Sequence, residues 1–272
     1  MNDAYLQFMP QSMHALTIVA LLMVRMLVAF SMLPMFAAAS VPVTVRTAFT
    51  AGLALCLLPV VISRVELQAL TPGMLMMLTV KEAGIGAVLG LLGSLVFYSL
   101  QVAGSMIEMQ SGLSMAALID PNSGHESSLI SSLFQQLFSI LFIVTGGLLA
   151  YIGMLFESYS VWPLQTLVPA FDSARLATLI VSSFAGMLWL AIKIAVPFVV
   201  LLLLVELAVG FLSRMVPQAN AFFLSLPLKV LLLGVLLLAF CTVLAGSPAS
   251  VFNATTYFQD VLFKVRAVAG GT

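Results

Sequence analysis

The chain has 272 residues, of which 62% are hydrophobic and only 7% charged, and its formal net charge is zero. A soluble domain has about 25% charged residues, so ten basic and ten acidic side chains are too few to cover a water-facing surface, and they form no basic patch for nucleic acid. Together with a mean hydropathy of +1.19, this composition indicates an integral membrane protein built from helices.

The hydrophobic residues gather in about six apolar runs, at 13–39, 47–62, 74–100, 129–156, 176–212 and 230–244. We expect them to form one all-α integral-membrane domain over residues 1–272. The first eleven residues contain no Lys or Arg, and the first run carries Arg25, so no cleavable signal is expected. The fourth run is predicted to break at Gly146-Gly147.

Arg25 lies near the middle of the first run. A charge at that depth in a bilayer costs roughly 2.5–3.5 kcal/mol, so we expect its side chain to face protein or water. Pro34 and Pro42 follow, and each disfavours helix at the residue before it. The segment 32–45 therefore reads as a bent turn.

Two features distinguish the third run. Lys81 and Glu82 are neighbours, so they are predicted to point in different directions and to need separate partners. Gly86 and Gly90 have the GxxxG spacing that lets two helix backbones approach closely. Helix packing is the interpretation we favour for these glycines.

The stretch 101–128 is the longest that cannot be read simply as apolar helix. It contains Glu108, Asp120, His125 and Glu126, and it has no Lys or Arg. We predict that it is a polar loop held between hydrophobic hairpins and that it is the functional part of the chain.

The fifth run is too long for one bilayer crossing. At ~1.5 Å per residue, residues 176–212 would form about 55 Å of helix, nearly twice a ~30 Å hydrocarbon core. Pro197 is expected to divide this run into two shorter helices. Lys193 and Glu206 would lie on nearly opposite faces of a straight helix, so they can pair only if the chain folds back or if their partners come from elsewhere.

The chain shows no catalytic pattern of the HExxH, GxSxG or Walker type. His125-Glu126 is the only candidate acid–base pair, and a solvated dipeptide is the better interpretation. Cys56 and Cys241 lie far apart in apolar runs and are interpreted as small buried hydrophobes. We therefore expect a protein that is not an enzyme, with no cofactor and no metal site.

Charges inside apolar runs have two interpretations. They can mark the ion path of a proton-coupled secondary transporter or channel. They can also form pairs between chains in a large membrane complex, which would explain runs longer than a bilayer.

Three stretches resemble one family in the same order. These are RMLVAFSMLPMFAAASVPVTVR (25–46), GSMIEMQSGLSMAALIDPNSG (104–124, the middle signature) and GFLSRMVPQANAFFLSLPLK (210–229, the late signature). Together they resemble the FliR/SctT (SpaR/YscT/HrcT) export-gate family of bacterial type III secretion. SGHESS and SYSVWP are more similar to the injectisome branch than to the flagellar branch.

The resemblance implies a core export-apparatus protein of the bacterial inner (cytoplasmic) membrane, with a role in virulence if the branch is correct. It implies bent helical hairpins built into a multi-subunit helical ring with SctR-type and SctS-type subunits, beside an SctU-type switch subunit. Exported unfolded polypeptides would pass through the ring, and no nucleic acid is expected as a partner. Such a chain gates transport and does not supply its energy.

The resemblance also suggests residue roles. A pore or plug role falls on Gly104, Met106, Met109, Gln110, Gly112, Met115, Asp120 and Pro121. A buried-charge or assembly role falls on Arg25, Lys81, Glu82, Lys193, Glu206, Arg214, Gln218 and Asn220. The methionines can form a deformable seal, or they can simply fill gaps in a hydrophobic protein.

Overall fold

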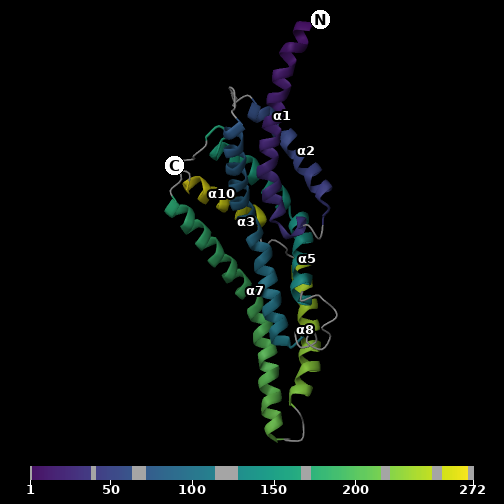
Figure 1. The fold of residues 1–272 in the computed structure, drawn as a ribbon. Helices are drawn as coiled ribbons and strands as arrows, with labels where there is room; N and C mark the ends of the chain where they lie inside the picture. The colour runs from purple at the N-terminus through teal and green to yellow at the C-terminus, as the bar shows by residue number, and fades with distance from the viewer. Residues whose placement is uncertain are drawn as a thin grey trace. The chain divides into compact units, whose positions relative to one another are not determined.

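The computed structural model describes residues 2–37, 41–62, 72–113, 128–166, 173–215, 221–246 and 253–268. Within these ranges every regular element is helical (Figure 1). All of them are α-helices except η1, a short 3-10 helix over Pro34–Phe36. The all-α prediction is confirmed.

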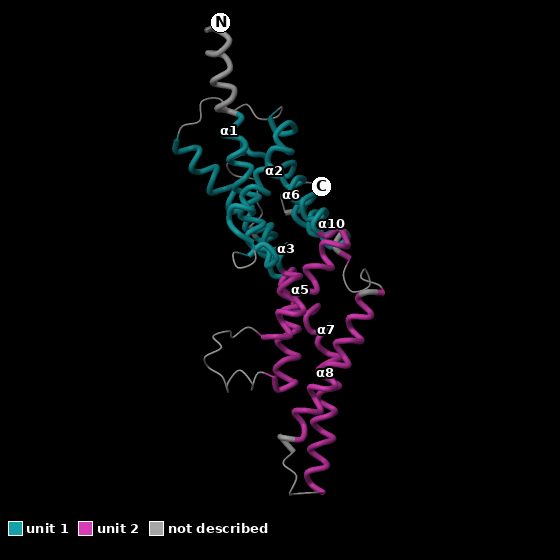
Figure 2. The backbone as a smooth tube through the Cα atoms, turned by 90° about the vertical axis from the view of Figure 1, so that its right-hand side faces the viewer, with its two compact units in different colours: residues 1–94, 148–181, 255–272 teal, residues 95–147, 182–254 magenta. Residues whose placement is uncertain are grey.

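The chain divides into two compact units, shown in different colours in Figure 2. Unit 1 consists of residues 1–94, 148–181 and 255–272, and unit 2 of residues 95–147 and 182–254. Two long helices, α3 (Pro72–Ser111) and α7 (Ser173–Met215), contribute residues to both units. That residues 1–272 form a single integral-membrane domain stays a prediction.

Unit 1 is built around α1 (Asn2–Ser31), α2 (Val43–Ile62) and the first part of α3, with α6 (Gly147–Val161) and α10 (Ala254–Val268). Helices α1 and α2 pack against each other, joined through the predicted bend at η1. The rings of Phe30, Phe36 and Phe49 lie within 5.7 Å of one another and fill the corner between the two helices.

The GxxxG spacing brings α3 onto α1 at backbone distance. A Cβ atom on Gly86 would lie 2.5 Å from the carbonyl oxygen of Arg25, and one on Gly90 would lie 2.9 Å from that of Ala29. Real Cβ atoms do not approach so closely, because these are van der Waals overlaps. The prediction of close helix packing is confirmed.

Unit 2 contains the end of α3, α5 (Leu129–Val144), most of α7 and α8 (Ala221–Gly246), drawn as the magenta tube in Figure 2. Phenylalanine rings from all four helices meet in its core: Phe97, Phe134, Phe138, Phe142, Phe198 and Phe240. Helix α5 ends before Gly146, whose φ of +78° suits glycine, and α6 begins at Gly147. The predicted break is confirmed.

The prediction that Pro197 divides the fifth run is wrong. Helix α7 continues from Ser173 to Met215 with Pro197 inside it. Proline removes only one helical hydrogen bond. Opening the helix in apolar surroundings would leave more backbone groups without partners, which costs more.

The predicted polar loop begins eleven residues too early. Residues 101–111 are the last three turns of α3, and the helix ends at Gly112, whose φ is +83°. Leu100, Ala103 and Ile107 are buried at helical spacing, so an apolar stripe continues beneath the polar residues. Residues 114–127 lie outside the described part of the chain.

Among the described residues, four helices are long and apolar enough to cross a membrane: Val43–Ile62, Pro72–Ser111, Ala174–Met215 and Leu224–Leu244. The pair Leu129–Val144 and Gly147–Val161 could form a fifth span, and Ala15–Ser31 is a shorter apolar helix. The protein is therefore an all-α membrane protein. Because α2 is mostly unburied, Cys56 is exposed, and the predicted burial of this thiol is wrong.

Candidate functional site

In unit 1, Arg25 forms the centre of a buried charged cluster. Its Nε donates to Glu82 Oε2 at 2.6 Å, and neither side chain is exposed. The two remaining guanidinium nitrogens donate to Ser158 Oγ at 2.9 Å and to the Trp162 carbonyl at 3.0 Å. The guanidinium carbon also lies 3.9 Å from the centre of the Tyr159 ring. The expectation that Arg25 faces protein is confirmed.

Lys81 joins the same cluster. Its Nζ lies 2.8 Å from Glu82 Oε1 and donates to the carbonyls of Pro163, Leu164 and Thr166 at 3.0–3.2 Å. Each of the two side chains has its own partners, as predicted: Arg25 for Glu82, and the three carbonyls for Lys81. The prediction that they point in different directions is wrong, because the flexible lysine stem also reaches the neighbouring carboxylate. Lys81 therefore fastens the end of α6 to α3.

This cluster holds helices together. Arg25 comes from α1, Lys81 and Glu82 from α3, and the acceptors from α6 and the residues after it. The interpretation of these three charges as pairs between chains is wrong, because they pair within one unit. Removing one member would leave a buried charge uncompensated, which is strongly destabilising.

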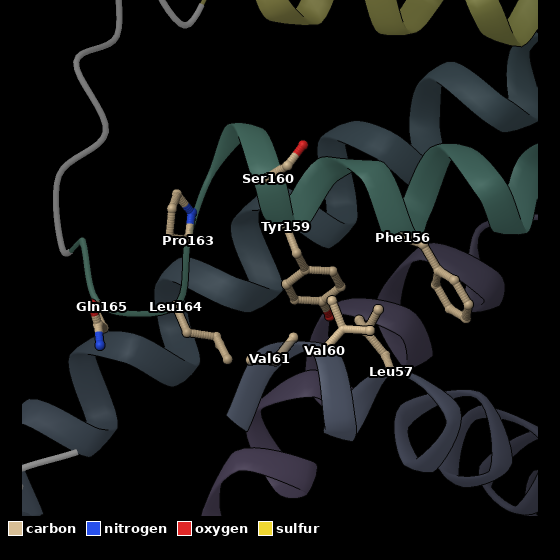
Figure 3. A pocket seen from close by; sticks show the side chains of 9 residues that line it. All are labelled: Leu57, Val60, Val61, Phe156, Tyr159, Ser160, Pro163, Leu164 and Gln165. Atoms are coloured by element: carbon tan, nitrogen blue, oxygen red, sulfur yellow. The ribbon is translucent and has the colours of Figure 1, made fainter. Parts of the chain in front are cut away.

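A cavity of about 260 Å³ lies beside this cluster, between α2 and α6. Leu57, Val60 and Val61 of α2 face Phe156 and Tyr159 of α6, as Figure 3 shows. The rest of the lining consists of Ser160, Pro163, Leu164 and Gln165. Its only titratable side chain is that of Tyr159, whose hydroxyl donates to the Leu22 carbonyl at 3.0 Å. The lining therefore offers no acid or base aimed at a ligand.

In unit 2, a second polar cluster forms at the C-terminal end of α3. Gln110 Nε2 donates to Glu206 Oε2 of α7 at 3.1 Å. Lys229 of α8 donates to the same carboxylate oxygen at 3.0 Å and to the Gln110 carbonyl at 3.2 Å. Three helices are thus joined at one point, and the Lys229 charge lies at the C-terminal end of α3, where a helix favours cations.

The other side of α3 is fastened to α5. Glu108 Oε2 accepts hydrogen bonds from the Ser128 hydroxyl and, at 2.9 Å, from the Ile130 N–H. A Cβ atom on Gly104 would lie 2.6 Å from the Cα of Ser131, so α3 and α5 touch along their backbones. Gly104 therefore has a packing role in this structure.

Gly112 connects the middle and late signatures. A Cβ atom there would lie 2.6 Å from Leu226 Cδ2, and Leu226 and Lys229 both belong to the late signature. Sequence reasoning singled out Gln110, Gly112 and Glu206 but not Lys229 or Glu108. The sequence signal for Lys229 and Glu108 is weak. One is a single charge near a proline and the other lies in a polar stretch, and neither setting reveals the partner.

The other predicted residues are not brought together. Met106 and Met109 are exposed on α3, at 39% and 76%, while Lys193 and Arg214 are exposed on α7. Met115, Asp120, Pro121, Gln218 and Asn220 lie outside the described residues. Within the described ranges, no group of three or more His, Cys, Asp or Glu side chains is placed to hold a metal ion.

Comparison with known proteins gives consistent matches over most of the chain. The family model described as "Bacterial export proteins, family 1" matches residues 16–255. The chain is 29% identical over 235 residues to the flagellar biosynthetic protein FliR of Bacillus subtilis, covering 86% of this chain and 90% of that protein. It is 30% identical over 224 residues to the Yop proteins translocation protein T of Yersinia pestis, covering 81% and 84%.

A third relative is the surface presentation of antigens protein SpaR of Shigella sonnei, 30% identical over 185 residues, with 67% of this chain and 65% of that protein covered. The matched residues 16–255 include both clusters and all three signature stretches. The chain therefore belongs to family 1 of the bacterial export proteins, the FliR/SctT family of type III secretion.

Proposed function

We propose that this chain is a core subunit of a type III export apparatus in the bacterial inner membrane. With SctR-type and SctS-type subunits it would form the gate through which unfolded proteins are exported, beside an SctU-type switch subunit. Support comes from its family and from the names of its relatives, which describe flagellar biosynthesis and Yop translocation.

The single observation that carries the proposal is the exposed apolar length of α7. Large apolar side chains are exposed from Phe184 to Met215, about 47 Å at 1.5 Å per residue. A hydrocarbon core is only about 30 Å thick, so lipid alone does not cover this surface. Apolar surfaces of other chains in the same complex would cover the rest of α7 and keep it out of water.

We further propose that the end of α3 belongs to the gate. Met106 and Met109 project from this helix end, and methionine packs deformably against neighbours of irregular shape. Gly104 and Gly112 then have structural roles, in close packing and in ending the helix. The proposed plug role of Met115, Asp120 and Pro121 concerns residues outside the described part of the chain.

The proposal is tested by purifying the tagged chain in mild detergent from cells that express a whole export apparatus. We expect small hydrophobic subunits to co-purify in fixed ratio. A single monodisperse protein that moves a small solute when reconstituted alone would overturn the proposal and favour the proton-coupled transporter. The self-contained pairing of Arg25 with Glu82 argues against an ion path through that cluster.

We also propose the injectisome branch, supported by SGHESS and SYSVWP in the sequence. Relatives from flagellar and virulence systems match with similar identity. Expressing the chain in strains that lack either the flagellar or the injectisome subunit tests this assignment. Restored motility without restored effector secretion would contradict it.

A further inference from the structure

Helix α5 begins at a point that depends on a side chain from another helix. The first N–H groups of any α-helix lack partners within the helix. Here the Ser131 N–H donates to the Ser128 hydroxyl oxygen at 3.2 Å, which is an ordinary N-cap. The Ile130 N–H instead donates to Glu108 Oε2 at 2.9 Å, from a residue 22 positions earlier in the chain.

Glu108 thus completes the cap of α5 from the last turn but one of α3. The Ser128 hydroxyl donates to the same carboxylate oxygen, so the cap residue is itself held in place. A negative charge at a helix N-terminus is also favoured by the helix dipole. Hydrogen bonds to a charged acceptor are the stronger kind, and this oxygen accepts two.

The surrounding contacts make the junction rigid on both sides of Glu108. The Ser131 hydroxyl donates to the Gln101 carbonyl at 2.9 Å, two turns before Glu108 on α3. Gly104 lets the backbones of α3 and α5 touch at Ser131. Glu108 is the charged group at the far end of this seam, where α3 ends.

We propose that Glu108 is a positioning residue of the export gate, which fixes the start of α5 to the end of α3. This inference rests on the proposed function, because it assigns a role in keeping the resting gate impermeable. In the sequence, Glu108 is one of several acids in a polar stretch, with nothing local to distinguish it. Its partners are two residues at the start of a different helix, which spacing along the sequence does not reveal.

Three substitutions at Glu108 distinguish the contributions of side-chain length, charge and hydrogen bonding. Glu108→Gln keeps the length and an amide oxygen that can accept both hydrogen bonds. Glu108→Asp keeps the charge but is one methylene too short to reach both donors. Glu108→Ala removes both bonds. Ser105→Ala is the matched control, because Ser105 is exposed one turn earlier on α3 and its hydroxyl bonds only to the Val102 carbonyl.

The experiment measures ion leak with a membrane-potential dye, and secretion of a reporter substrate, in cells carrying the whole apparatus. Losing one charged hydrogen bond corresponds to about a tenfold shift between closed and open states, equivalent to ~1.4 kcal/mol. We expect a leak at least about tenfold above wild type for the alanine and aspartate variants. The glutamine variant should leak less than the alanine variant, because its neutral oxygen still accepts both bonds but more weakly than a carboxylate. Ser105→Ala should remain near wild type, with equal amounts of assembled complex in all four.

If Glu108→Ala leaks no more than wild type, the inference is overturned. It is also overturned if Glu108→Gln leaks as strongly as Glu108→Ala. If the alanine variant fails to accumulate, Glu108→Asp decides, since it keeps the Ser128 cap of α5 but shortens the reach of the carboxylate: a leak at normal complex levels supports the inference, and tightness overturns it. Gly112→Asp tests the proposed function separately. If that change affects neither leak nor secretion, the gate assignment itself fails, whatever Glu108 does.

Discussion

The glycine that ends α3 provides the sharpest test of the structure. Gly112 has φ +83°, a left-handed conformation that costs an L residue roughly 1–2 kcal/mol. A Cβ atom at this position would also lie 2.6 Å from Leu226 Cδ2. The Gly112→Ala substitution therefore brings two separate penalties, backbone strain and a contact that must be relieved.

The second penalty is limited, because Leu226 presents the far end of its side chain. Moving that methyl group requires an off-rotamer χ angle, which costs about 0.5–1.5 kcal/mol. The total for Gly112→Ala is thus about 1.5–3.5 kcal/mol. Gly146→Ala is the matched control, since Gly146 has φ +78° and no atom within 4 Å of its Cβ position. It should show the strain penalty alone, about 1–2 kcal/mol.

Stability is measured by titrating the purified complex with SDS in maltoside micelles and following loss of helicity. The contact penalty appears in a double-mutant cycle with Leu226→Ala as an interaction energy of about 0.5–1.5 kcal/mol. The Gly234→Ala variant, in the interior of α8 with no neighbour within 4 Å, should be about 1 kcal/mol more stable than wild type. Equal stability of Gly112→Ala and wild type, or a larger loss for Gly146→Ala, would refute the reasoning.

Three further predictions follow from unit 1. Arg25→Met should lower the free energy of unfolding by about 3–5 kcal/mol, because it leaves Glu82 buried without its main partner. The double variant with Glu82→Leu should lose less stability than the two single variants added together. Complex yield and the same SDS titration measure both. A change only in pH dependence, with full assembly, would instead support the transporter interpretation. Gly86→Ala should disrupt the contact with α1, whereas Gly84→Ala, with nothing within 4 Å, should be tolerated; equal yields would contradict this. Burial raises the pKa of Tyr257, so its phenol stays protonated in the folded protein. Stability should then be constant below about pH 9 and fall above about pH 10 as the unfolded state ionises, and Tyr257→Phe should reduce that fall.

Local properties of the sequence predicted much of unit 1 correctly. Composition alone indicated helices in a membrane, because charged residues are too few for a water-facing surface. The burial of Arg25 followed from the cost of a charge in lipid, and the contact of Gly86 and Gly90 with α1 followed from their spacing. The inferences about Arg25 and the two glycines need only a short window of sequence.

Prediction from the sequence fails where polar residues lie on a continuous helix. The end of α3 carries Glu108 and Gln110, and this polarity suggested a loop from residue 101 onward. The helix continues because Ala103 and Ile107 keep a buried apolar stripe, while the polar groups find partners on α5, α7 and α8. Those partners are 22 to 119 positions away, so no local pattern identifies them.

Lys193 and Glu206 of α7 show where prediction from the sequence stops. Helical spacing placed Lys193 and Glu206 on different faces and predicted partners from elsewhere unless the chain folds back. For Glu206 the partner is Lys229 in the same unit, and Gln110 donates to the same carboxylate oxygen. Lys193 is exposed, and its partner in another chain stays a prediction. Periodicity determines which way a side chain points, but only the tertiary structure determines what it meets there.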